Sequence, residues 1–79
     1  MGTKLLRLPD VLSATGYSRS SIYLMIHQGL WPRQVNLGSR SVAWPESEVS
    51  ALIDARIAGK SEEEIRELVA SLEQRRAAA

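Results

Sequence analysis

Apolar residues recur at helical spacing twice within residues 8–28, and a glycine separates the two runs. The inward positions of the first run are Leu8, Val11, Leu12 and Thr15. Those of the second run are Ile22, Met25, Ile26 and Gly29. Gly16 can take the left-handed conformation that ends a helix, and Ser18 can cap the next helix by accepting a backbone N–H bond. The pattern predicts two short helices joined by a tight turn.

The second of these helices is expected to present a small, polar outward face with almost no acids. At about 3.6 residues per turn, this face consists of Ser20, Leu24 and His27, flanked by Arg19, Tyr23, Ser21 and Gln28. A helix of this kind fits the major groove of DNA, where side chains near its N-terminus meet base edges. A guanidinium can bind guanine or phosphate, and serine hydroxyls can bond either one. At this point the pattern is equally compatible with a DNA-reading helix-turn-helix and with an ordinary helical hairpin whose serines only cap the helix.

Residues 34–44 alternate between apolar and polar positions, as strands do. Val35 and Leu37 share one face, and Val42 and Trp44 share another, on either side of a loop at residues 38–41. A basic hairpin directly after a recognition helix forms a wing. Its tip residue, Arg40, is then placed to enter a minor groove or to bind a phosphate. The alternative is a plain hairpin whose tip arginine is only solvated.

A third helix is predicted to close the core over the first two. Pro45 suits a first helical position, and Gly59 suits the end of the helix. Its inward stripe is expected to be Val49, Leu52, Ile53 and Ile57.

A last helix follows, beginning with a capping box formed by Ser61 and Glu64. Its apolar stripe is Ile65, Leu68, Val69 and Leu72, and residues 75–79 are expected to fray. Two placements of this stripe remain open: it folds back onto its own domain, or it pairs with another protomer.

The formal net charge of the 79-residue chain is only +1, but the charge is unevenly distributed. Residues 1–45 hold five basic residues and one acid, giving +4, whereas residues 46–79 hold five basic residues and eight acids, giving −3. The predicted reading half is thus the basic half. Because affinity for DNA comes largely from phosphate neutralisation, so few cations predict weak binding by one copy. We therefore expect a homo-oligomer or a cooperative assembly on double-stranded DNA.

Other functional classes receive little support from the composition. The chain has no cysteine and one histidine, His27, so no zinc site, other metal site or His-centred triad is expected. Its acids suit helix first turns, which leaves almost no support for an enzyme, and no cofactor is expected. No apolar run approaches a signal peptide or a membrane span, so a cytoplasmic protein without membrane contact is expected.

Two motifs carry a family resemblance. The first is L-x-x-V-x-x-x-T-G-x-S-R-S-x-I-Y, from Leu8 to Tyr23, and the second is L-G-x-R-x-V-x-W-x-x-x-E-V, from Leu37 to Val49. With them, residues 7–58 resemble the AlpA-type phage regulatory proteins, which are related in fold to excisionases and to the DNA-binding part of MerR-type regulators. The resemblance implies a winged helix-turn-helix of phage, prophage or integrative-element origin that binds DNA. The chain departs from the family at Leu24, where the resemblance implies a basic residue.

The resulting prediction is a mainly α fold: a small winged helix-turn-helix of three helices and a two-stranded β-hairpin, with an extra C-terminal helix. Residues 1–58 would form the DNA-binding domain, and residues 59–79 a helical extension for packing or self-association. The predicted function is sequence-specific transcriptional regulation, with an integrase or RNA polymerase as a further candidate partner. The alternatives are an excisionase-like factor that bends DNA and, in another class, a protein-interaction module using the last helix. The predicted DNA contacts are Ser18, Arg19, Ser20, Ser21, Tyr23, Leu24, His27, Arg33, Ser39 and Arg40.

Overall fold

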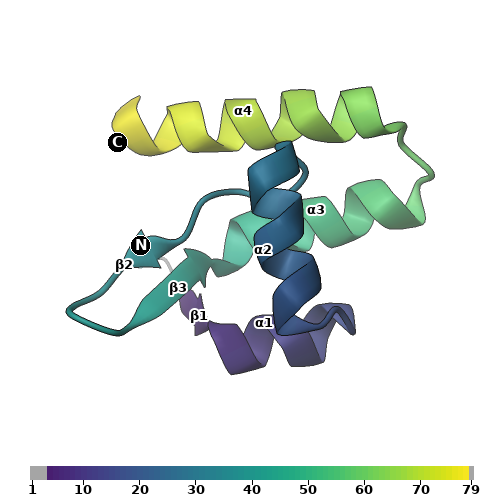
Figure 1. The fold of residues 1–79 in the computed structure, drawn as a ribbon. Coiled ribbons are helices and arrows are strands. Elements are labelled where there is room, and N and C mark those ends of the chain that lie inside the picture. Colours follow the sequence, from purple (N-terminus) through teal and green to yellow (C-terminus); the bar gives the residue numbers. More distant parts are fainter. Residues whose placement is uncertain (1–3, 79) are drawn as a thin grey trace.

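The computed structural model, which describes residues 4–78, consists of four helices and a small sheet that lies at the left of Figure 1. The elements in chain order are β1 (Leu5–Arg7), α1 (Leu8–Thr15), α2 (Arg19–Gln28), β2 (Val35–Asn36), β3 (Val42–Pro45), α3 (Glu46–Ile57) and α4 (Glu62–Ala78). This is the mainly α, winged helix-turn-helix fold with an additional C-terminal helix that the sequence predicts.

The sheet differs from the predicted hairpin because it has a third strand within the described residues. Its order is β1-β3-β2, and β3 pairs antiparallel with both neighbours. Leu6 lies opposite Trp44, and Val35 lies opposite Ala43. Strand β1 is only three residues long, too short to show an alternating pattern of its own. It is a strand because β3 supplies its hydrogen-bonding partner.

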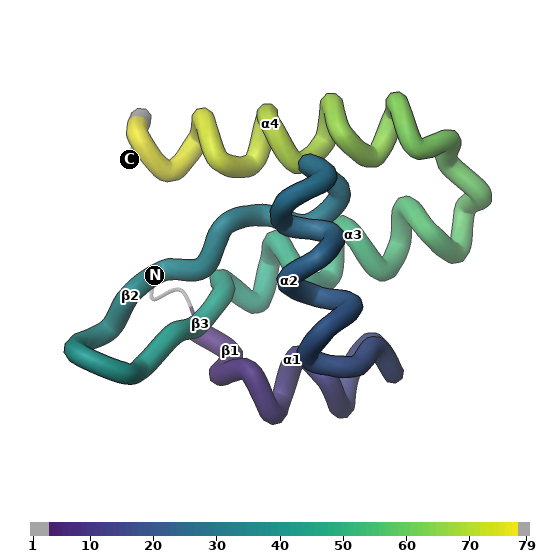
Figure 2. Tube along the Cα trace, viewed as in Figure 1, coloured from purple at the N-terminus to yellow at the C-terminus, as the bar shows by residue number. Residues whose placement is uncertain are grey.

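The helix-turn-helix forms where the helix-ending glycine and the helix-capping serine predict it. Gly16 has φ 78° and donates its N–H to the Leu12 carbonyl, which ends α1. Ser18 then caps α2 by accepting the Ser21 N–H at 3.1 Å. In Figure 2 the trace of α2 rises from the end of α1 toward α4. Helix α2 therefore runs across the directions of α1 and α4.

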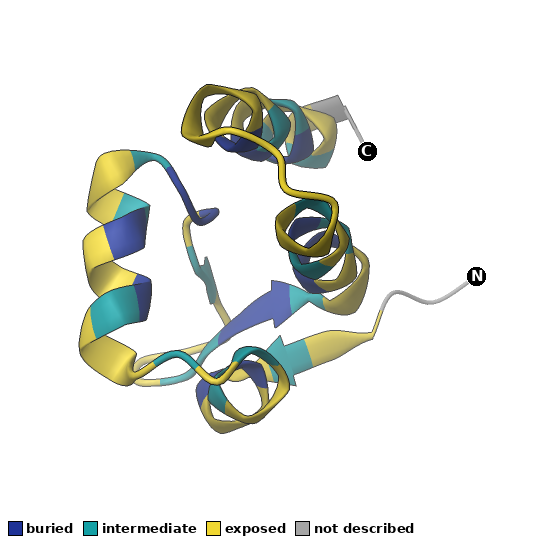
Figure 3. Ribbon diagram, turned by 90° about the vertical axis from the view of Figure 1, so that its right-hand side faces the viewer, coloured by how far each residue is buried: buried dark blue, intermediate teal, exposed yellow. Residues whose placement is uncertain are grey.

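One hydrophobic core extends through all four helices and the sheet (Figure 3). Both tryptophans belong to it, and the Trp44 indole Nε1 donates to the Pro32 carbonyl at 2.8 Å. The predicted stripes of α1 and α2 face this core. The stripe of α3 also faces the core at Val49, Leu52 and Ile53. Ile57 is 80% exposed, so its predicted inward position is wrong. The last turn of α3 extends beyond the elements that cover the rest of that helix.

The apolar stripe of α4 packs into the same core, which decides between the two placements left open by the sequence. Ile65, Val69 and Leu72 are buried, and Leu68 packs against them. Burial within the same protomer removes Ile65, Val69 and Leu72 from the self-association predicted for this stripe, and Leu68 is half-buried against them. The alternative function, a protein-interaction module, is predicted to bind its partner through this apolar stripe. The same burial makes the stripe unavailable to a partner.

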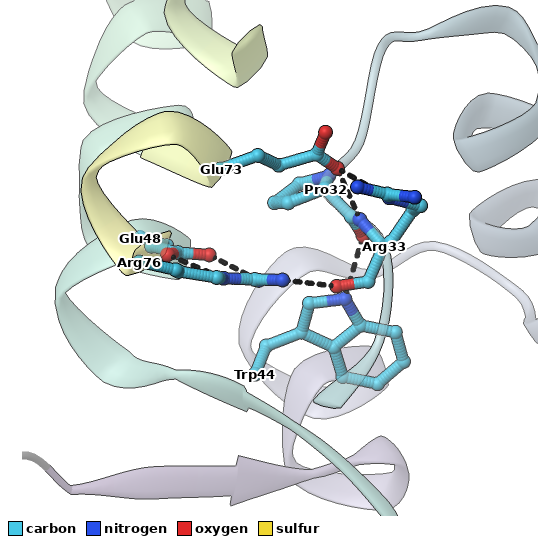
Figure 4. Close-up of polar contacts among 6 residues, drawn as sticks. All are labelled: Pro32, Arg33, Trp44, Glu48, Glu73 and Arg76. Atoms are coloured by element: carbon cyan, nitrogen blue, oxygen red, sulfur yellow. Dashed lines mark hydrogen bonds and ion pairs between the residues drawn. The ribbon is translucent and has the colours of Figure 1, made fainter. Parts of the chain in front are cut away.

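An ion pair between a buried carboxylate and a half-buried arginine connects the end of α4 to the start of α3 (Figure 4). Glu48 is 5% exposed and receives two hydrogen bonds from Arg76, one of them from Nε at 2.9 Å. Arg76 Nη1 also donates to the Arg33 carbonyl at 2.9 Å, and the Arg33 N–H donates to Glu73 at 2.7 Å. The expectation of fraying from residue 75 is thus wrong, because Arg76 compensates a buried carboxylate.

We predict that Arg76→Ala lowers the free energy of unfolding by about 3 kcal/mol, because it leaves the Glu48 carboxylate buried without its partner. Urea denaturation measures this loss. Arg75→Ala removes the same charge from the adjacent position, which is exposed and makes no ion pair in the described structure, and should change stability by less than about 0.5 kcal/mol. Equal losses in the two variants would contradict the anchoring role.

The capping box at the start of α4 is also present. Ser61 donates its N–H to Glu64 Oε1 at 2.9 Å, and the Glu64 N–H donates to Ser61 Oγ at 3.2 Å. The hydrogen bonds from the Ser61 backbone and hydroxyl lower the pKa of Glu64 below its ordinary value, and the charge of Lys60 acts in the same direction.

Because folding lowers this pKa, the Glu64 carboxylate contributes stability that is complete above the pKa of the unfolded chain. The contribution is lost as the pH falls through the folded-state pKa. We therefore expect Glu64→Gln to be less stable than the wild type at pH 7, with the gap closing as the pH falls below about 4. Urea denaturation over a pH series tests this, with Glu63→Gln as a charge-matched control. A gap that is independent of pH would show that the ionised cap contributes nothing.

Candidate nucleic-acid interface

A groove of about 350 Å³ lies where β1, the start of α1, the start of α2 and the wing meet. The wing here means β2, β3 and the loop between them. The groove is lined by Arg7, Leu8, Pro9, Arg19, Tyr23, Arg40 and Val42. The structure thus brings Arg19 and Tyr23 of α2 together with Arg40 of the wing, three of the residues predicted to contact DNA.

Three arginines in this groove lack an acidic partner. Arg7, Arg19 and Arg40 are exposed, and within residues 4–78 none lies at salt-bridge distance from a carboxylate. Three arginines outside the groove are paired with acids: Arg33 with Glu73, Arg66 with Glu62 and Arg76 with Glu48. Three guanidinium groups converging without a counter-charge form a surface for a polyanion, because each group presents a rigid fork of donors that matches phosphate geometry.

Arg7 is the groove residue that the sequence reasoning missed. It lies in β1 opposite Ala43 of β3, and its Nη2 donates to the Ser41 hydroxyl of the wing at 3.3 Å. A basic residue directly before a helix beginning with Leu-Pro-Asp was visible in the sequence, but only the pairing of β1 places it beside the wing. Arg7 therefore adds a cation at the base of the wing.

The outward face of α2 is open to solvent, as its periodicity predicts. Ser20 and His27 are exposed, Leu24 is 57% exposed, and Tyr23 stands at the edge of the groove. Leu24 makes the centre of this face apolar, where a thymine methyl group can pack. The exposed face and the groove together form one continuous candidate surface along α2.

Two of the predicted serine contacts are occupied in building the helix. Ser18 Oγ accepts the Ser21 N–H and also donates to Ser21 Oγ at 3.0 Å. Ser18 is thus the N-cap, and Ser21 is half-buried beside it. Ser20 is exposed, and its hydroxyl makes no hydrogen bond to another described residue.

The two remaining predicted contacts lie apart from the groove lining. Arg33 is held at α4: its Nε lies 3.6 Å from Glu73 Oε2, and its backbone bonds to Glu73 and Arg76 (Figure 4). The structure does not bring Arg33 to the groove, because the loop carrying it is fastened to the last helix. Ser39 is exposed in the loop of the wing, next to Arg40.

Metal-binding and membrane-spanning features are both absent from the part of the chain that the structure describes. No group of three or more His, Asp or Glu side chains there is placed to hold a metal ion. None of the helices in residues 4–78 combines the length and apolar character needed to cross a membrane.

Residues 4–57 match a protein family described as prophage CP4-57 regulatory protein (AlpA). The chain belongs to the AlpA family. A segment of 57 residues is 49% identical to the uncharacterized protein ORF88 of Enterobacteria phage P4, covering 72% of this chain and 65% of that relative. The match thus spans less than two thirds of the relative's length. No solved structure gives a significant match.

All residues that line the groove lie within the segment that matches the AlpA family, whereas α4 lies outside it. The family therefore accounts for the helix-turn-helix and the wing. It does not account for the helix that completes the core of this chain.

The serine arrangement at the start of α2 yields a stability prediction. Ser18→Ala should lower the free energy of unfolding by about 1 kcal/mol, because the Ser21 N–H loses its acceptor. Ser20→Ala should change it by less than about 0.5 kcal/mol, since Ser20 is exposed. Urea denaturation of the two variants distinguishes them. A loss confined to Ser20→Ala would show that the cap is misassigned.

Proposed function

We propose that this AlpA family protein is a sequence-specific DNA-binding transcriptional regulator. The observation that carries the proposal is the convergence of the unpaired Arg7, Arg19 and Arg40 on one groove beside the start of α2. The regulatory role of the family supports the same assignment. Regulation would act by occupancy: the bound protein recruits, blocks or bends, and no chemical step is required.

In this arrangement the start of α2 enters the major groove. Arg19 reads a base edge or binds a phosphate, and Tyr23, Leu24 and His27 extend the contact along the helix. The positive end of the helix dipole at Ser18 also favours a phosphate. Within this set, Arg19 and Leu24 are the side chains suited to base recognition, because a guanidinium fork matches guanine and an aliphatic group matches a thymine methyl.

Arg7 and Arg40 flank that helix from the sheet. Arg40 lies in the loop of the wing and Arg7 at its base, so the two cations follow the duplex beyond the segment contacted by α2. Each contact to a phosphate contributes about 0.9 to the slope of log K against log salt concentration. Three such cations give modest affinity, so tight binding needs neighbouring copies on adjacent sites.

The first experiment is selection of bound duplexes from a random pool, followed by titration of the best site at two salt concentrations. Enrichment of one motif with steep salt dependence supports the proposal. Inverted half-sites indicate a two-fold dimer, whereas direct repeats with bending indicate an excisionase-like factor. Equal, weak binding to every duplex would contradict sequence-specific regulation.

Arginine substitutions then separate the roles on the selected site. Arg19→Ala should relax the preference at one base pair by about 1 to 3 kcal/mol. Arg7→Ala and Arg40→Ala should each weaken binding to all duplexes and reduce the salt slope by about 1. Fluorescence anisotropy over a salt series measures both effects.

Arg75→Ala is the matched control, because Arg75 is an exposed arginine of α4 outside the groove and without an acidic partner in the described structure. It should leave affinity and salt slope nearly unchanged. If the three single variants Arg7→Ala, Arg19→Ala and Arg40→Ala all bound DNA with wild-type affinity, the groove would not be the DNA-binding surface.

A further inference from the structure

A second hollow lies at the opposite end of α1 from the arginine groove. The groove takes Leu8 and Pro9 from the start of α1, whereas this cavity takes Ala14 and Thr15 from its end. Its volume is about 200 Å³, and its other lining residues are Tyr17, Trp31, Leu52, Ile53, Arg56 and Ile57. The two hollows share no residue, so an occupant of this cavity does not compete for the proposed DNA surface.

The cavity wall contains a hydrogen-bond donor without an acceptor. Trp31 is 3% exposed, and its indole Nε1 is the one buried side-chain nitrogen or oxygen without a partner among the residues that the structure describes. Tyr17 packs edge-on against the same ring, with centroids 6.3 Å apart. A buried donor without an acceptor is costly, and native structures rarely retain one without a reason.

The rim combines an exposed aliphatic side chain with an unpaired cation. Ile57 is 80% exposed, the highest value among the large apolar residues exposed in the described structure. Arg56 is exposed, has no carboxylate at salt-bridge distance, and is the one charged residue in the described lining. An apolar lining next to a guanidinium without a counter-charge is complementary to an aliphatic group next to a carboxylate.

We propose that this cavity is a docking site for a protein partner, which seats one aliphatic side chain beside Trp31 and places a neighbouring carboxylate on Arg56. The volume favours a side chain over a small-molecule ligand, because pockets for such ligands occupy about 300 to 1,000 Å³.

The charges argue against a second copy of this chain as the occupant. The other large apolar side chains that stand exposed in the described structure are Leu5, Tyr23, Leu24 and Leu37. All of them lie in residues 1–45, the half with a formal charge of +4, and would bring like charge to Arg56. A two-fold contact through Ile57 would likewise bring two copies of Arg56 to one interface.

The test selects ligands for the full-length protein from a displayed library of random linear peptides, without DNA. We expect enrichment of peptides in which an aliphatic residue adjoins Asp or Glu. Arg56→Glu should weaken the selected peptide about tenfold, and a version with Lys in place of its acid should recover that affinity. Arg75→Glu, an equal charge change at another exposed arginine, should leave the affinity unchanged.

The two tryptophans provide a spectroscopic readout with an internal reference. In ¹H–¹⁵N correlation spectra, the selected peptide should shift the indole signal of Trp31, which lacks an acceptor, and leave that of Trp44, which already donates to Pro32. The proposal is overturned if the enriched peptides lack acids, if they bind Arg56→Glu as tightly as the wild type, or if the Trp31 signal stays fixed. It is also overturned if the wild type sediments as a dimer and Ile57→Glu as a monomer, because a second copy would then cover the cavity.

Discussion

The burial of Trp44 in the central strand is the constraint on which the arrangement of this fold depends. Its ring is fully enclosed, and its indole N–H is bonded to the Pro32 carbonyl in the loop that follows α2. Strand β3 pairs on both sides and leads directly into α3. One side chain therefore helps to set the distance between α2, the wing and α3. The geometry of the arginine groove follows from that spacing.

The groove draws its charge from residues far apart in the chain. Arg7 comes from an edge strand, Arg19 from a helix start and Arg40 from a loop, and the sheet order β1-β3-β2 brings the first and last of these to one side. Arginines that stabilise the fold are paired, whereas those facing the groove are left unpaired. The net charge of +1 therefore does not reveal that the groove is locally cationic, because paired arginines and acids elsewhere in the fold cancel in the sum.

Local signals predicted most of the helical architecture. Gly16, Ser18 and the Ser61–Glu64 pair act within one turn of the chain, so their geometry could be inferred from spacing alone. Strand β1 could not be inferred in this way, since its partner lies in β3, and the place of Arg7 in the groove follows from that pairing. The same holds for Glu48, which looks like a routine first-turn acid until α4 brings Arg76 to it.

The pairing of Glu48 with Arg76 also affects the order in which the chain folds as it is made. The two residues are 28 positions apart, and Arg76 lies close to the end of α4. A nascent chain that has emerged only as far as the wing and α3 holds every residue of the arginine groove, yet it lacks the cation that compensates a carboxylate destined for burial. The surface proposed to read DNA would thus become stable only after synthesis has passed residue 76, which limits how soon a new copy can occupy its site.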